Sequence, residues 1–244
     1  MLAALPVATI AHIAIMSKRK SPLQATVALL LLVSAASLGI AARLYLQGQG
    51  GQVVFVATRV WILLLPIAWY LRVDRQRLSL PRPTQRELGA GILLGVGMFG
   101  VIYGAYVGLE QRWLDPATVQ AAAAQVGLLN PEIYLASAVY FTFGNALVEE
   151  YIWRWFVYQK CEVLVPGGWA VALAALFFTL HHIIALAGFT GSWAVVILGS
   201  VGVFVAGVVW SWCYLTYRSL WACYISHLLA DLAIAIVGWQ LLFA

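Results

Sequence analysis

The chain has 244 residues, of which 64% are hydrophobic and only 9% are charged, with a mean hydropathy of +0.92. A soluble domain carries about 25% charged residues, so this composition excludes a soluble protein and predicts a single all-α, polytopic transmembrane domain over residues 1–244. The net charge of +5 is interpreted as loop charge that sets the topology. Nucleic-acid binding would need a basic surface in water, so we expect membrane lipids and no nucleic acid as partners.

Apolar runs long enough to span a membrane, about 20 residues each, recur along the whole chain. They predict a bundle of about eight transmembrane helices, over residues 1–17, 23–46, 52–72, 88–109, 133–158, 167–188, 193–216 and 220–243. The first run has no basic segment before it and no clear cleavage site, so we interpret it as a short span and not as a signal peptide. The longest connection, residues 110–132, is expected to contain a short interfacial helix.

Basic residues lie in alternate connections. Lys18, Arg19 and Lys20 follow the first span, five arginines lie at or between the third and fourth spans, and Lys160 and Arg218 fall on the same side. The positive-inside rule predicts that this side is cytoplasmic and that both termini are non-cytoplasmic, in a plasma (inner) membrane.

Small and aromatic residues in the spans predict packing surfaces. The fourth span contains Gly91 and Gly95, and this small-xxx-small spacing favours the close approach of another helix. The eleven tryptophans are expected to be mostly interfacial anchors or lipid-facing bulk.

Few ionisable residues lie inside the spans: Arg59, Glu149, Glu150, Arg154, His181, His182, His227 and Asp231. A charge at the bilayer centre costs at least about 2.5 kcal/mol, so such residues usually face the interior of a bundle and have a function. All except Arg59 belong to the fifth, sixth and eighth spans. Residues 133–243 are therefore predicted to carry the functional site.

The fifth span contains the segment ALVEEYIWRWF, with two adjacent glutamates. Glu150 and Arg154 are four residues apart and share a helix face, which predicts an ion pair. Glu149 is rotated by about 100° from Glu150, so it is the freer carboxylate and could take a proton from water. Asn145 lies one turn before Glu149 and is a candidate substrate-binding residue.

The sixth span contains the segment FFTLHH, which offers two overlapping pairs four residues apart. Phe177 shares a face with His181, and Phe178 shares the next face with His182. Both histidines are catalytic candidates, with a preference for His182. Phe178 is a candidate substrate contact.

The eighth span places His227 and Asp231 four residues apart, so both can project toward one point. Carboxylates and imidazoles on three helices fit hydrolysis by a Glu149-activated water, a metal site, or proton-coupled transport. The absence of an HExxH motif argues against a metal, and the absence of an inverted repeat argues against transport. We therefore predict no metal and no cofactor.

In chain order, the EEYIWR, FFTLHH and HLLAD segments fit the motifs EExxxR, FxxxH and HxxxN/D. In this order on separate helices they resemble the CPBP family, which includes CAAX prenyl endopeptidases and bacteriocin-processing or immunity (Abi) proteins. Its members are described as glutamic-type intramembrane proteases. The resemblance extends over about residues 140–235 and implies an endopeptidase that hydrolyses a membrane-associated or lipidated peptide or protein.

The resemblance also implies a role for each matched position. Glu149 would activate water together with the FxxxH histidine, and Glu150 would assist or be held by Arg154. His227 and Asp231 would form the oxyanion-stabilising pair. Asp231 stands where the prenyl proteases have asparagine, and an ionised carboxylate cannot donate to an oxyanion. Either Asp231 is protonated in its low-dielectric site, or it orients His227 as a charged donor, and we favour the second. The alternative within the same family is a catalytically inactive membrane scaffold.

Overall fold

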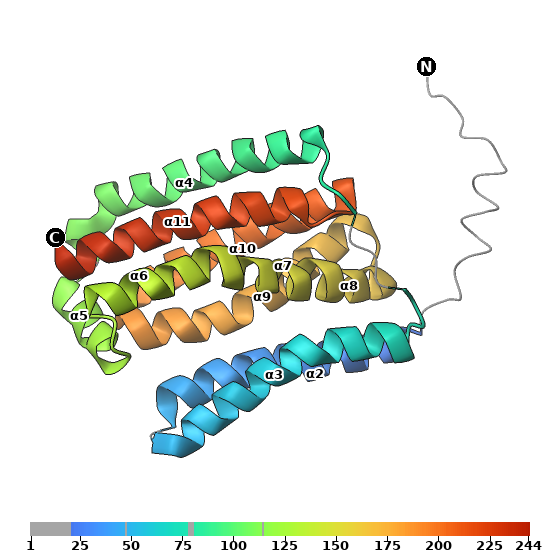
Figure 1. Ribbon diagram of the computed structural model, residues 1–244, viewed down its shortest axis with the longest axis horizontal. Helices are drawn as coiled ribbons and strands as arrows, with labels where there is room; N and C mark the ends of the chain where they lie inside the picture. Colours follow the sequence, from blue (N-terminus) through green and yellow to red (C-terminus); the bar gives the residue numbers. More distant parts are fainter. Residues whose placement is uncertain (1–20, 47, 78–80, 114) are drawn as a thin grey trace.

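The computed structural model describes residues 21–46, 48–77, 81–113 and 115–244, and none of these residues forms a β-strand (Figure 1). Among these residues, six helices are long and apolar enough to cross a membrane: α2 (Pro22–Tyr45), α3 (Gly48–Arg72), α4 (Gln85–Trp113), α9 (Gly167–Thr190), α10 (Trp193–Tyr217) and α11 (Trp221–Phe243). A further helical segment runs without a break through residues 131–164. The predicted all-α polytopic bundle is confirmed, while the predicted span 1–17 lies outside the described residues.

Three helices begin with the same local sequence, a polar residue followed by proline. The side chains of Ser21, Asp115 and Asn130 accept hydrogen bonds from backbone N–H groups of the first turn of α2, α5 (Pro116–Gln125) and α6 (Pro131–Val139). Proline fits the first position because its missing N–H would have no helical partner there. α5 confirms the short helix predicted within the connection at residues 110–132.

The helical segment 131–164 changes its winding four times. It consists of α6, the π-helix η1 (Tyr140–Asn145), α7 (Ala146–Glu150), the π-helix η2 (Tyr151–Tyr158) and α8 (Gln159–Leu164). At the end of η1 the backbone N–H of Ala146 donates to the carbonyl of Phe141, five residues back. Such π segments are often found at functional sites, and here they lie on both sides of the two glutamates.

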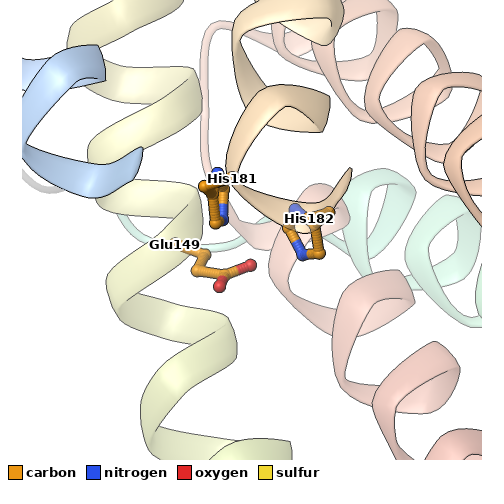
Figure 2. Close-up of side chains that lie close together, drawn as sticks. All are labelled: Glu149, His181 and His182. Carbon is orange, nitrogen blue, oxygen red and sulfur yellow. The ribbon is translucent and has the colours of Figure 1, made fainter. Parts of the chain in front are cut away.

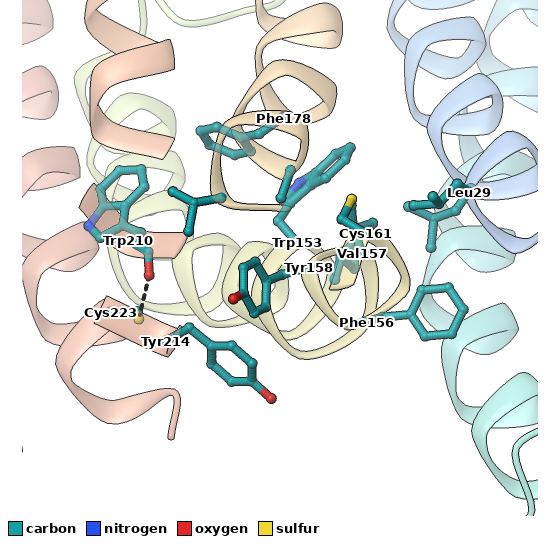
Figure 3. Close-up of a cluster of buried hydrophobic side chains, with 14 of the residues drawn as sticks. Leu29, Trp153, Phe156, Val157, Tyr158, Cys161, Phe178, Trp210, Tyr214 and Cys223 are labelled. Atoms are coloured by element: carbon teal, nitrogen blue, oxygen red, sulfur yellow. Dashed lines mark hydrogen bonds between the residues drawn. The ribbon is translucent and has the colours of Figure 1, made fainter. Parts of the chain in front are cut away.

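The helices form three layers in Figure 1. α2 and α3 pair at the bottom of this view, α4 and α11 pair at the top, and the segment 131–164 lies between them with α9 and α10. The core between the layers is rich in aromatic side chains, including Trp153, Phe156, Phe178, Trp210 and Tyr214 (Figure 3). The middle layer therefore holds the fifth, sixth and seventh predicted spans against α11.

The close packing predicted for Gly91 and Gly95 is confirmed, and the partner is α11. A Cβ atom on Gly91 would lie 3.0 Å from the carbonyl oxygen of Ala222, and one on Gly95 would lie 2.6 Å from a methyl group of Leu229 and 3.0 Å from Cα of Ser226. The missing side chains thus let α4 approach the backbone of α11, which carries two of the candidate site residues.

Replacing Gly95 with valine is expected to destabilise the protein by about 1–3 kcal/mol, because the added methyl groups have no room against α11. The measurement is thermal unfolding of the detergent-purified protein. Gly97, two residues away, has open space around its Cβ position, so Gly97→Val is the matched control. Equal destabilisation by both substitutions would contradict the packing interpretation.

Two ion pairs and one hydrogen bond join α8 and the connections that follow α3 and α10 at one end of the bundle. Lys160 of α8 pairs with Asp74, which follows α3. Arg218, which follows α10, donates to both oxygens of Glu162 at 2.6 and 2.7 Å. The indole of Trp221, at the start of α11, donates to the carbonyl of Pro81 at 2.7 Å. The basic residues that follow the third, fifth and seventh predicted spans therefore lie at the same end of the bundle.

Candidate active site

The two glutamates of the fifth predicted span lie in different surroundings, although they are adjacent in sequence. The side chain of Glu150 is 0% exposed and that of Glu149 is 12% exposed. Asn145, one turn earlier, donates from Nδ2 to Oε1 of Glu149 at 3.0 Å. Asn145 therefore holds one oxygen of Glu149 and leaves the other oxygen directed into the site.

Glu150 contacts a guanidinium and an imidazole from different helices. Its Oε2 lies 3.3 Å from Nε of Arg154, and its Oε1 lies 2.7 Å from Nδ1 of His227 on α11. A carboxylate without a proton only accepts hydrogen bonds, so Nδ1 of His227 carries the hydrogen of this contact. The bond fixes the imidazole with its Nε2 pointing away from Glu150.

Nε2 of His227 points between two further carboxylates. It lies 3.6 Å from Oε2 of Glu149 and 3.6 Å from Oδ1 of Asp231. The structure thus brings His227 and Asp231 together, as expected from their spacing, but the short bond to His227 comes from Glu150. If Nε2 also carried a hydrogen, the imidazole would be positively charged and would lie between two carboxylates. The negative charge of these carboxylates therefore favours the imidazolium form of His227.

The two adjacent histidines of α9 differ in their contacts. Nδ1 of His182 lies 2.9 Å from the carbonyl oxygen of Phe178, so this nitrogen must carry the hydrogen and Nε2 is left with a lone pair. His181 is more deeply buried and stacks on Trp153, with ring centroids 5.0 Å apart and planes inclined by 5°. His182 is thus the histidine whose free nitrogen and accessibility suit contact with water.

Glu149, His181 and His182 form a compact cluster, which Figure 2 shows. One oxygen or nitrogen atom from each lies within 4.8 Å of the others. Two imidazoles and one carboxylate are also a ligand set that suits zinc with a water in the fourth position. Nδ1 of His181 is buried and has no hydrogen-bond partner in the part of the chain that the structure describes. These residues could therefore hold a divalent cation.

Arg154 lies against aromatic rings instead of water. Its guanidinium carbon is 4.5 Å from the ring centroid of Phe178 and 4.9 Å from that of Trp210, and its terminal nitrogens have no hydrogen-bond partner among the described residues. Cation–π attraction and the ion pair with Glu150 compensate part of its loss of hydration.

Phe178 itself is only 2% exposed and packs against His181, His182 and His227. The expectation that Phe178 contacts the substrate therefore disagrees with its burial. Its ring instead packs against the three histidines and helps to hold their positions.

Two buried tryptophans complete the site, and sequence reasoning missed both. Trp210 of α10 stacks on His227 with ring centroids 4.0 Å apart, and its indole N–H donates to Ser226 at 3.0 Å. Trp153 stacks on His181 in the same manner. The expectation that tryptophans lie at interfaces or against lipid is wrong for these two. Of the two, only Trp153 could have been suspected from the sequence, because it lies inside the EExxxR motif.

The comparison with known families covers this part of the chain. Residues 131–233 match the family described as type II CAAX prenyl endopeptidase Rce1-like. This match supports the resemblance to the CPBP family of CAAX-type proteases. The CPBP match begins at the first residue of α6 and includes Glu149, His182, His227 and Asp231, whereas α2, α3 and α4 precede it. No curated protein and no solved structure matches the chain.

Proposed function

We propose that the protein is an intramembrane endopeptidase of the glutamic type. The observation that best supports this proposal is that the two adjacent glutamates have different contacts. Glu150 is engaged by Arg154 and His227, whereas Glu149 keeps one oxygen directed toward His227 and lies beside His182. The family match supports a protease of the CAAX type, and the geometry supports the residues named for each step.

Glu149 is proposed to be the general base. A water molecule has two hydrogens, and Oε2 of Glu149 and Nε2 of His182 are two acceptors on one side of the site. As the water oxygen forms its bond to the substrate carbonyl carbon, its proton passes to Glu149. The same proton then goes to the departing amine when the carbon–nitrogen bond breaks, so Glu149 ends the cycle ionised.

His227 is proposed to stabilise the oxyanion. Its Nε2–H is held at a fixed place by the bond from Nδ1 to Glu150 and by stacking on Trp210. A preorganised donor in a dry site stabilises the negative charge of the tetrahedral intermediate more than water would. Glu150 thus acts as an orienting carboxylate behind a histidine, and Asp231 lies at the other side of Nε2, where it supports the imidazolium.

The proposed substrate is a membrane-associated or lipidated peptide, and a prenylated CAAX peptide is the first to test because the matched family is named for it. We also propose that the bundle end with Arg218 and Lys160 is cytoplasmic, in a plasma (inner) membrane with non-cytoplasmic termini. The gathering of the basic connections at that end supports this orientation.

A metal-dependent hydrolase is the second candidate function, and the cluster of Glu149, His181 and His182 favours it. In that case the cation would bind water in place of direct activation by Glu149. Proteolysis by the purified protein, assayed with and without EDTA, separates the two. The glutamic mechanism predicts an unchanged rate after chelation. Loss of activity that added zinc restores would contradict it and would support the metal site.

A further inference from the structure

Arg59 is an ionisable residue inside the spans that the proposed mechanism does not use. It lies near the middle of α3, and its guanidinium carbon is 4.9 Å from the ring centroid of Phe55. Ile62 and Pro66, three and seven residues later, share its helix face and are buried in the bundle. Arg59 therefore projects from the side of α3 that packs against the protein, and it is half-buried there.

This side of α3 adjoins the glutamates. The hydroxyl of Tyr151, the residue after Glu150, donates to the carbonyl of Leu63 at 3.0 Å. Leu63 lies one helical turn after Arg59. The guanidinium is also close enough to His181 for a Coulombic interaction with the imidazole. Arg59 thus places a permanent positive charge beside the catalytic cluster, from a helix that lies outside the family match.

No carboxylate of the described residues forms an ion pair with Arg59, in contrast to the other buried cations. Arg154 pairs with Glu150, and Lys160 pairs with Asp74. A charged side chain at this depth costs at least about 2.5 kcal/mol, so an unpaired arginine indicates that an anion comes from elsewhere. A lipid headgroup is an unsuitable source, because headgroups lie about 15 Å from the middle of the hydrocarbon core.

We propose that Arg59 binds the free α-carboxylate at the C-terminal end of the peptide being cleaved, an inference that rests on the protease function proposed above. A guanidinium matches a carboxylate with two parallel hydrogen bonds, and dehydration in the membrane strengthens this pair. Because Arg59 is fixed next to the cluster, the distance between them limits how many residues can follow the scissile bond, at about 3.3 Å each. The protein would therefore act near the free end of a chain.

The test uses two prenylated CAAX peptides of identical sequence, one ending in a carboxylate and the other in a carboxamide. The wild type in neutral-lipid vesicles is expected to cleave the carboxylate form with a kcat/KM about 10- to 100-fold higher, typical of a charged hydrogen-bonded pair. Arg59→Gln is expected to abolish this preference by lowering the rate for the carboxylate form toward the rate for the carboxamide, and Arg59→Lys should retain part of it. Arg43→Gln, at an exposed arginine of α2, should leave both rates unchanged.

Each of the following outcomes would overturn the proposal, and each has a different meaning. Equal cleavage of both peptides by the wild type excludes a carboxylate site while leaving the protease function intact. A preference that persists in Arg59→Gln, or an equal loss of both rates in that variant, assigns the residue another role. An effect of Arg59→Gln that appears only in vesicles containing anionic lipid indicates a headgroup. Cleavage of neither peptide contradicts the protease function, and the Arg59 proposal with it.

Discussion

Replacing Glu149 with glutamine is expected to lower the rate of peptide hydrolysis by about 100- to 10,000-fold, the usual contribution of a general base. Glutamine has the same shape as glutamate and can still accept the hydrogen bond from Asn145, but it cannot take a proton from water. The rate is measured with purified protein in detergent and a prenylated CAAX peptide. Thermal unfolding of the same samples should be nearly unchanged, because the side chain is partly accessible.

Glu132→Gln is the matched control, since Glu132 is an exposed glutamate at the start of the same helical segment. Full activity of Glu149→Gln would contradict its role as the base. The alternative that the protein is an inactive scaffold of the same family leads to a different expected result. It would show no Glu149-dependent hydrolysis in the wild type, and the Glu149→Gln variant would keep its biological activity.

Replacing Glu150 with glutamine is expected to remove most activity and also to destabilise the fold by about 3–5 kcal/mol. The instability follows because Arg154, which is 1% exposed, would stay buried with its charge uncompensated. The loss of activity follows because a neutral amide would hold His227 less firmly in the imidazolium form. Thermal unfolding and the hydrolysis rate are measured on the same preparation.

The double variant Glu150→Gln with Arg154→Met separates these two effects. It removes both charges at once, and replacing a buried ion pair with apolar packing is often neutral for stability. We therefore expect stability to recover while activity stays low. Recovery of activity together with stability would show that Glu150 is needed only to neutralise Arg154, and the proposed orientation of His227 would then be wrong.

Much of the fold could be predicted from the sequence because spans are encoded locally. An apolar run of about 20 residues has few alternatives to a membrane helix, so α9 and α10 lie within two residues of their predicted positions. The π winding of η1 and η2 could not be predicted, because an apolar helix has the same composition in either winding. The pairing of α4 with α11 was indicated only by the spacing of two glycines.

The candidate site was predictable where its contacts follow helix periodicity. The pairs Glu150–Arg154 and His227–Asp231 are both four residues apart, and the structure brings each together. The contact between Glu150 and His227 joins residues 77 positions apart, and no local pattern specifies it. The stacking of Trp210 on His227 was likewise hidden, because tertiary packing decides which of eleven tryptophans turn inward.

The π winding beside the glutamates determines where this part of the chain tolerates a change in length. A π segment holds more residues per turn than an α-helix, so deleting one residue from Tyr140–Asn145 would let the segment relax into an ordinary α-helix, with the residues after it in about the same orientation. Deleting one residue from the α-helical turns of α6 has no such outlet, and everything after that deletion would rotate by about 100° relative to the start of α6. Glu149 and Glu150 would then face other neighbours, and an intact membrane protein would lose its site through one missing codon.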